Sequence, residues 1–169
     1  MIRNFVKGRV YVFIDAANIF YSQRSLKWRI SYVRLREYFT KECNASKMFV
    51  YTAHDAMRPQ QERFLRMLQT NGYIVRTKPV KKIRIAHGIY EWKGDFDVEL
   101  TMDILDHITE YDTAILLSGD SDFAPVVDRV KSHGKRIIVM SVKDHISREL
   151  LQRAKFINLK KLRDQIELV

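Results

Sequence analysis

At residues 116–123 the chain reads Leu-Leu-Ser-Gly-Asp-Ser-Asp-Phe, and the fold is best worked out from this stretch. The apolar segment at residues 114–117 has the length and composition of a buried strand. Two carboxylates one residue apart, Asp120 and Asp122, follow it directly before an expected helix. Ligands of an open α/β sheet bind at the carboxyl ends of its strands, especially where the strand order reverses. The stretch therefore predicts a strand-to-helix unit with a site at the end of the strand.

A second apolar run, residues 10–14, also ends on a carboxylate, Asp15, and Asn18 follows three residues later. If the two strands are neighbours, Asp15, Asp120 and Asp122 share one small space. Clustered carboxylates repel one another and resist desolvation unless a cation joins them. A site made of carboxylates and water, without Cys or His, selects Mg²⁺ or Mn²⁺ over zinc. The sequence thus predicts a metal site.

Strand and helix patterns alternate along the chain, which favours an α/β fold with a mostly parallel sheet and helices on both faces. Strands are expected at residues 10–14, 48–51, 73–75, 114–117, 137–140 and 156–159. Helices are expected through residues 18–21, at 31–44 and 59–72 with their end signals included, at 95–108, 122–133 and 147–154, and at the end of the chain. Segment 76–93 is compatible with a hairpin or a loop. We expect a single domain over residues 1–169.

The composition of the 169 residues, 46% hydrophobic and 30% charged, is typical of a soluble globular protein. The single cysteine, Cys43, fits a reducing cytosol. The first apolar run is too short for a signal peptide or a membrane span. We therefore expect a cytoplasmic protein, and a homodimer is compatible with the sequence.

The charge balance points to a polyanionic partner. Thirty Lys and Arg residues against twenty Asp and Glu give a formal net charge of +10. Nucleic acid is the commonest partner of so basic a chain, although a generally basic surface would give the same total.

Segment 76–93 concentrates that charge, with six cations against one acid and with Tyr90 and Trp92 interleaved. Cations that contact phosphates, beside aromatic rings that stack on unpaired bases, are typical of a groove for single-stranded RNA. The alternative is an ordinary exposed hairpin. The residues expected to contact RNA are Lys78, Lys81, Lys82, Arg84, Lys93 and the hydroxyl of Ser118. A smaller basic and aromatic cluster follows the first strand, at Arg24, Lys27, Trp28 and Arg29.

A fourth acid, Asp97, begins the apolar stripe of the helix expected at residues 95–108, because steps of three and four residues lead from it to Leu100 and Ile104. It is therefore expected to face the sheet, whereas Asp103 belongs to a face expected to be solvated. The alternative for Asp97 is an acid that favours the helix dipole by ~0.3–1 kcal/mol.

The other acids also have structural alternatives. Asp15 could cap the first helix, and Ser121 or Asp122 the later one. Capping by either of those two leaves Asp120 without a role. Asn18 could orient a ligand or be an ordinary residue of the first helical turn.

Three blocks, residues 15–18, 93–100 and 118–123, resemble the signature blocks of the NYN domain. NYN domains are a branch of the PIN-like metal-dependent ribonucleases, and the match is best to the LabA-like members of bacteria and archaea. The resemblance implies a PIN-like three-layer sandwich with strand order 3-2-1-4-5. It also implies that Asp15, Asp97, Asp120 and Asp122 hold Mg²⁺ or Mn²⁺ for RNA cleavage. Because Asp95 and Phe96 stand where some members have one residue, Asp95 competes with Asp97 for the helix position.

The functional prediction is a metal-dependent ribonuclease that cuts single-stranded or unpaired RNA, with Asp15, Asn18, Asp97, Asp120 and Asp122 as catalytic residues. The alternative is a non-catalytic RNA-binding or regulatory module on the same fold. The four acids argue against that alternative, since a binder of polyanions gains nothing from carboxylates in its groove. Nucleotide triphosphate chemistry is disfavoured because the chain has no Gly-x-x-x-x-Gly-Lys loop.

Overall fold

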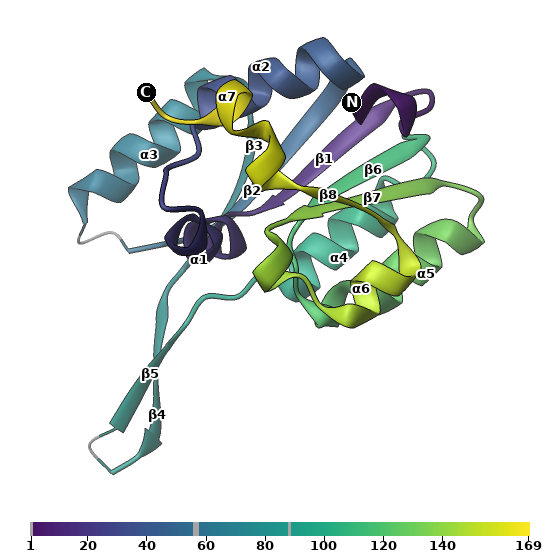
Figure 1. The fold of residues 1–169 in the computed structure, drawn as a ribbon. Coiled ribbons are helices and arrows are strands. Elements are labelled where there is room, and N and C mark those ends of the chain that lie inside the picture. The colour runs from purple at the N-terminus through teal and green to yellow at the C-terminus, as the bar shows by residue number, and fades with distance from the viewer. Residues whose placement is uncertain (1, 56–57, 88) are drawn as a thin grey trace.

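The computed structural model describes residues 2–55, 58–87 and 89–169. A six-stranded sheet in the order β3-β2-β1-β6-β7-β8 forms its centre, and every neighbouring pair is parallel (Figure 1). The strands are β1 (Val10–Asp15), β2 (Ala45–His54), β3 (Ile74–Pro79), β6 (Thr113–Leu117), β7 (Arg136–Ser141) and β8 (Lys155–Asn158). When only the strands of this sheet are counted, the order is 3-2-1-4-5-6. The predicted order 3-2-1-4-5 is confirmed, and β8 extends the sheet beyond β7.

Helices cover both faces of the sheet, which gives the predicted three-layer sandwich (Figure 1). One face packs against α1 (Ala16–Leu26), α2 (Tyr32–Cys43), α3 (Pro59–Thr70) and α7 (Arg163–Ile166). The other face packs against α4 (Asp97–Asp106), α5 (Ala124–Ser132) and α6 (Arg148–Arg153). Short 3₁₀ turns lie at Ile2–Asn4, Ser121–Phe123, Lys143–His145 and Leu159–Leu162. Among the described helices, none combines the length and the apolar character that crossing a bilayer requires.

The central strands are apolar throughout because both of their faces are buried. Side chains alternate along a strand, so Val12 and Ile14 of β1 belong to the core under α1 and α2, while Tyr11 and Phe13 belong to the core under α4 and α5. In that second core, Phe13 stacks on Phe49 with 5.1 Å between the ring centroids. The continuous apolar runs of the sequence are thereby explained.

Local capping sets several of the predicted helix ends. The Ser31 hydroxyl accepts the Arg34 N–H at 3.3 Å at the start of α2, and Asn44 ends that helix in the left-handed conformation with φ 50°. Two other helices are shorter than predicted. The helix expected at 95–108 spans Asp97–Asp106, and the one expected at 122–133 is a 3₁₀ turn followed by α5. Pro125 lies in the first turn of α5, where its missing N–H costs no helical hydrogen bond.

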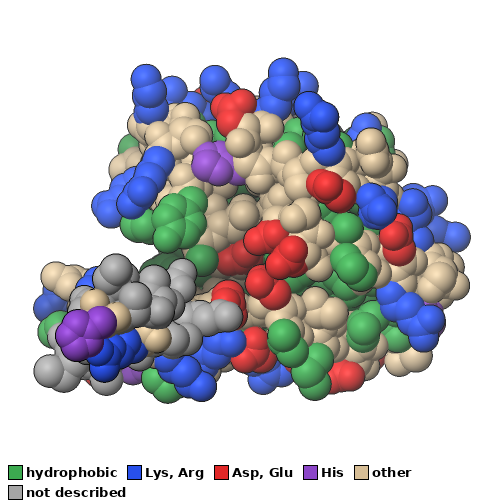
Figure 2. Space-filling model, turned by 90° about the horizontal axis from the view of Figure 1, so that it is seen from below, with side chains coloured by type: hydrophobic (Ala, Val, Ile, Leu, Met, Phe, Trp, Pro, Cys, Tyr) green, Lys and Arg blue, Asp and Glu red, His purple; other side chains and the backbone are tan. Residues whose placement is uncertain are grey.

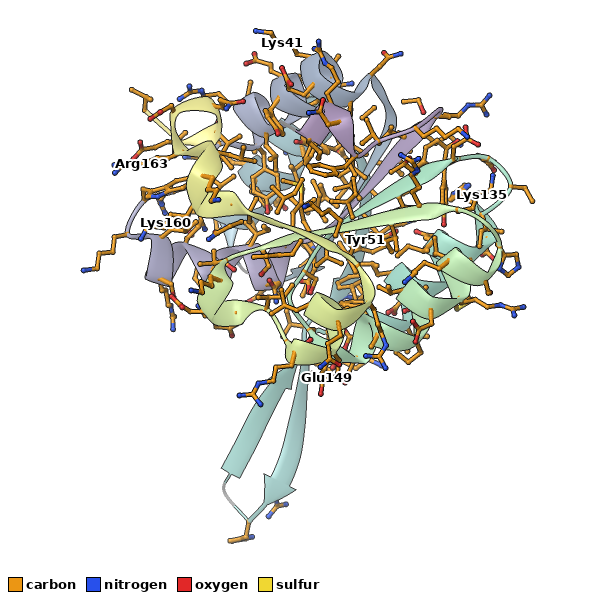
Figure 3. The ribbon with its side chains drawn as sticks, turned by 45° about the vertical axis from the view of Figure 1, so that its right-hand side comes forward. Lys41, Tyr51, Lys135, Glu149, Lys160 and Arg163 are labelled. Atoms are coloured by element: carbon orange, nitrogen blue, oxygen red, sulfur yellow. The ribbon has the colours of Figure 1, made fainter. Side chains whose placement is uncertain are left out.

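The segment left open between hairpin and loop contains an antiparallel hairpin, β4 (Lys81–Ala86) and β5 (Ile89–Lys93), separate from the main sheet. It projects from the body of the molecule (Figure 1). Figure 2 views the molecule from the hairpin side and shows acidic side chains gathered in the middle of this face, with Lys and Arg mostly around its edge. Lys41, Lys135 and Lys160 likewise lie at the periphery, whereas Tyr51 lies inside (Figure 3).

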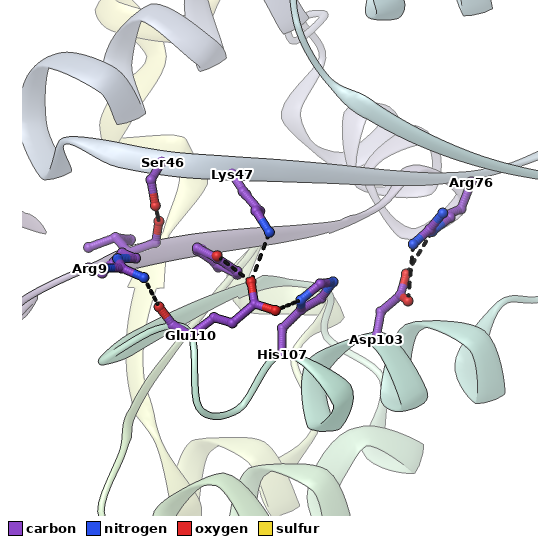
Figure 4. A network of polar contacts seen from close by, with 9 residues as sticks. Arg9, Ser46, Lys47, Arg76, Asp103, His107 and Glu110 are labelled. Atoms are coloured by element: carbon purple, nitrogen blue, oxygen red, sulfur yellow. Dashed lines mark hydrogen bonds and ion pairs between the residues drawn. The ribbon is translucent and has the colours of Figure 1, made fainter.

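Polar contacts fix α4 and the turn after it to the sheet (Figure 4). Asp103 accepts the Tyr51 O–H at 2.8 Å and the Arg76 Nε–H at 2.9 Å. The prediction that Asp103 lies on a solvated face is therefore wrong, and its side chain is 17% exposed. Its partners come from β2 and β3, which helical periodicity within 95–108 does not reveal.

Candidate functional site

The acids identified in the sequence meet at the carboxyl ends of β1 and β6. These strands pair in parallel, with Ile14 opposite Leu117, so Asp15 ends one strand beside the turn that carries Asp120. The adjacency that the metal prediction required is therefore present. Asp97 is the first residue of α4, and Asp122 lies in the 3₁₀ turn after β6.

Asp15 is held by hydrogen bonds to both of its carboxylate oxygens. Oδ1 accepts the backbone N–H of Asn18 at 3.0 Å, which caps α1, and Oδ2 accepts the Ser118 hydroxyl at 3.2 Å. Ser118, expected to contact RNA, is fully buried, and in this structure its hydroxyl contacts Asp15. Asp15 therefore caps α1, as the structural alternative predicted, and it also lines the cleft.

Asp120 and Asp122, the acids after β6, have different roles from those expected from the sequence. Asp120, not Ser121 or Asp122, provides the cap: its Oδ1 accepts the Asp122 N–H at 3.0 Å. Its own N–H donates to the Ser118 Oγ at 3.3 Å, and Asp122 is exposed. The reason is the 3₁₀ turn, which moves the cap one or two residues earlier than a directly following α-helix would.

Gly119 makes this turn possible. A Cβ at this position would collide with the backbone carbonyl of His145, and the Gly119 carbonyl accepts the Ser147 N–H at 2.9 Å. The turn therefore packs tightly on residues 141–147, and any larger residue would displace Asp120. Steric exclusion accounts for glycine here.

The acids act on one another electrostatically. Burial first, and then the charges of Asp120, Asp15, Asp95 and Asp122 in that order, together raise the pKa of Asp97 to about 6. Burial also raises the pKa of Asp15, against the lowering effect of its hydrogen bonds from Asn18 and Ser118. Such perturbed carboxyls in a cleft are typical of functional sites.

The sequence left Asp95 and Asp97 in competition for the helix position. Asp97 is half-buried at the start of α4, while Asp95 lies before the helix and is exposed, and both line the same cleft. Phe96 between them is buried against Tyr51, with 6.0 Å between the ring centroids. This buried ring fixes the register in which Asp97 faces the other acids.

The donor types fit Mg²⁺ or Mn²⁺, because every side chain of the cluster offers oxygen. Asn18 adds a buried amide oxygen that has no hydrogen-bond partner among the described residues. Over residues 2–55, 58–87 and 89–169, however, no three Asp, Glu, His or Cys side chains stand close enough together to hold an ion. Asp15 and Asp120 are instead turned onto local N–H groups, an arrangement expected of like charges that avoid one another.

A cleft of about 840 Å³ opens over the acids. Asp15, Asn18, Asp97 and Asp120 line one part of it. The rest is mainly apolar or aromatic and is lined by Phe20, Tyr21, Ile30, Val33, Phe64 and Met67. The cleft therefore joins a charged centre to an apolar wall.

The cations of segment 76–93 fall into two groups. Lys78 pairs with Glu99 at 2.7 Å and lies 4.6 Å from the centre of the Phe96 ring, so it supports α4. Lys81 and Arg84 lie on the hairpin and are exposed. Lys82 and Lys93 also belong to the hairpin, and their side chains fall outside the described part of the structure.

The sequence interpretation missed two residues of the cleft, Phe20 and Tyr21 on α1. The buried positions of this helix are Ala16, Ile19, Ser22 and Leu26, at helical spacing. That spacing turns positions 20, 21 and 24 outward. It is the sequence feature from which the exposure of Phe20 and Tyr21 could have been predicted. Trp28, grouped with Arg24 in the sequence, is instead a core residue, 7% exposed.

Comparison with known proteins identifies a family and a protein of similar fold. A model of the NYN domain matches residues 9–160. The Low amplitude and bright protein LabA of Synechococcus elongatus is 30% identical over 167 residues, which cover 96% of this chain and 90% of that protein. A crystal structure of a protein of unknown function from Vibrio parahaemolyticus superposes with a TM-score of 0.81 at 25% identity, covering 96% of this chain and 97% of the other.

Proposed function

Because the chain belongs to the NYN domain family, we propose that it is a metal-dependent ribonuclease that hydrolyses phosphodiester bonds of single-stranded or unpaired RNA. NYN domains have a nuclease-like fold, and the family is associated with RNA. The proposal takes residues 1–169 as one domain.

One observation carries the proposal: carboxylates from three separate segments, Asp15, Asp97 and Asp120, line one cleft. Burial, and after it the charges of the neighbouring acids, raise the pKa of Asp97. Such an arrangement opposes folding unless it serves a ligand, and the ligand that suits it is a hard divalent cation. Nucleases of this kind are generally dependent on divalent metals.

Asp15, Asp97, Asp120 and Asp122 are the residues that would hold Mg²⁺ or Mn²⁺, with the amide oxygen of Asn18 beside them. A bound ion of this type supplies a Lewis acid for the phosphoryl oxygen and lowers the pKa of its water. Ser118 fixes the orientation of Asp15 through its hydrogen bond to Oδ2. Asp97, with a pKa of about 6, can take up or release a proton close to neutral pH.

The second candidate is an RNA-binding module without catalysis. It is favoured by the hydrogen bonds that engage Asp15 and Asp120 as caps, since these give both acids a structural role. It leaves Asp97 unexplained, because a carboxylate beside the path of a polyanion weakens the binding of that polyanion.

The test is cleavage of an end-labelled, unstructured RNA by the wild type and by Asp120→Asn, each with Mn²⁺, Mg²⁺ or EDTA. Asn caps helices as well as Asp does, so the turn is retained. We expect the variant to lose more than about a thousandfold in rate, because a metal contributes several kcal/mol to stabilising the transition state.

Asp106→Asn is the matched control, since it neutralises an exposed acid at the far end of α4 and should cut normally. Full metal-dependent activity in Asp120→Asn would exclude this site. RNA binding by a wild type that cuts with none of the metals would favour the binding module.

A further inference from the structure

Two adjacent aromatic side chains stand exposed on α1 at the cleft. Phe20 is 56% exposed and Tyr21 is 55% exposed, whereas their neighbours Ile19 and Ser22 are buried. Large aromatic residues are usually covered in a folded protein, and exposed ones that adjoin a cleft commonly mark a binding surface. Among the described residues, packing leaves more than half of each side chain uncovered.

The two rings and one cation form a compact group. Phe20 and Tyr21 meet edge to face, with 5.7 Å between their centroids and 74° between their planes. The guanidinium carbon of Arg24 lies 5.6 Å from the centre of Phe20 and 5.4 Å from that of Tyr21. An aromatic face beside a guanidinium is the pairing on which unpaired bases stack while the cation meets a phosphate.

The group lies on the helix that begins at the acids. Asp15 caps α1, and at about 1.5 Å per residue Phe20 lies roughly 7 Å further along the helix axis. That distance corresponds to about two base steps of ~3.4 Å in a stacked strand. Phe20, Tyr21, Asp15 and Asp120 line the same cleft, so one nucleotide chain can reach both parts.

The surroundings favour a nucleic-acid strand over an apolar peptide. Arg29 and Arg58 line the cleft together with the apolar wall, and the chain carries a net charge of +10. In Figure 2, hydrophobic side chains with Lys and Arg close to them adjoin the acidic side chains. A strand that places phosphates near cations and bases on rings satisfies both features.

We propose that Phe20 and Tyr21, with Arg24, form a stacking subsite for an unpaired RNA base one or two nucleotides from the acidic cluster. The inference rests on the proposed function, because it names how that site holds its substrate. The subsite predicts a preference for unpaired RNA, since bases inside a duplex are stacked on both faces.

The test measures the affinity of a fluorescent single-stranded RNA in the Asp120→Asn background, where cleavage does not interfere. Phe20→Leu/Tyr21→Leu keeps apolar bulk and removes both aromatic faces, and we expect about tenfold weaker binding. Phe20→Trp alone keeps an aromatic face and should bind the RNA at least as tightly as the chain with Phe20. Leu151→Ala, which truncates an exposed apolar residue on α6, is the control and should bind as before.

A second measurement makes the result specific for a base. A series of oligonucleotides carries one abasic site, each at a different position. The protein that keeps both rings should bind one member of the series about tenfold more weakly than the intact oligonucleotide. Phe20→Leu/Tyr21→Leu should show no such loss. Equal affinities of the two chains, with the abasic loss retained in the variant, would overturn the subsite while the ribonuclease proposal stands. Failure of the wild type to bind or cut RNA would overturn both.

Discussion

Acids lie at both ends of the same sheet, and their surroundings are opposite. At the amino ends of the strands, Glu110 receives hydrogen bonds from Lys47 at 2.8 Å and Tyr11 at 2.7 Å and contacts His107 at 2.9 Å (Figure 4). These partners, Lys47 first, lower the pKa of Glu110 to about 2. At the carboxyl ends, burial and neighbouring acids raise the pKa of Asp97 to about 6.

The contrast separates acids whose pKa is lowered by cationic partners from acids whose pKa is raised by burial and by one another. Asp112, also near the amino ends, accepts the Arg9 N–H at 2.9 Å and lies 3.6 Å from the Lys135 ammonium, and its pKa is lowered as well. At the carboxyl ends, by contrast, partial burial and neighbouring acids raise the pKa of Asp97, and strongly shifted carboxyls in a cleft concentrate at functional sites.

The largest effect on stability that we expect from this contrast is produced by metal. Mn²⁺ or Mg²⁺ that binds only the folded chain should stabilise it by about 2.7 kcal/mol at a hundred times its Kd. The increase in Tm should vanish in Asp120→Asn and persist in Asp106→Asn. It should also decline below about pH 6 in the wild type, because protons then compete for Asp97. An equal increase in all three proteins would mean that the ion binds elsewhere.

A smaller effect is expected from Asp97→Asn in EDTA. The folded pKa of Asp97, about 6, lies above its ordinary value of 3.8. The contribution of Asp97 to wild-type stability is therefore most favourable below pH 4 and is lost as the pH rises towards and through 6. Allowing for solvent screening of a half-exposed group, the variant should be more stable at pH 7 by about 1 kcal/mol, or about 2–4 °C in Tm. Denaturation curves at pH 4 and pH 7 measure this, and a gain that is equal at both pH values would contradict the assignment.

The sequence was sufficient for those features that depend on local pattern. Apolar runs located the six strands, Ser31 located the start of α2, and carboxylates at two strand ends located the acidic cluster. The adjacency of β1 and β6 followed from the family resemblance, because composition alone does not order the strands of a sheet.

Features that depend on distant contacts could not be predicted. Asp103 is bound by Tyr51, 52 residues away, and by Arg76, 27 residues away, so its helix face is not solvated. The 3₁₀ turn that makes Asp120 the cap arises where Gly119 packs on the His145 carbonyl. Each of these depends on which segment lies alongside, and hydrophobic periodicity carries no information about that.

The smallest expected change in stability concerns Glu110, at the amino ends of the strands, and it has the opposite sign. Glu110→Gln should lower the Tm at pH 7 by less than Asp97→Asn raises it, because it removes the charge that Lys47 and His107 contact. The stabilisation from Glu110 is present above its ordinary pKa of 4.5 and is lost as the pH falls through about 2, so the variant and the wild type should converge in acid. Salt should reduce the difference, and Glu149→Gln, an exposed acid on α6, serves as the control.

The opposite signs are what make the pair of variants informative. Each substitution removes one negative charge from a chain of net charge +10, so an effect of overall repulsion would destabilise both variants alike. A rise in stability for Asp97→Asn together with a fall for Glu110→Gln can come only from the local surroundings of each acid. If both variants lose stability, the acidic cluster is not strained, and the physical argument for a cation at the carboxyl end of the sheet fails with it.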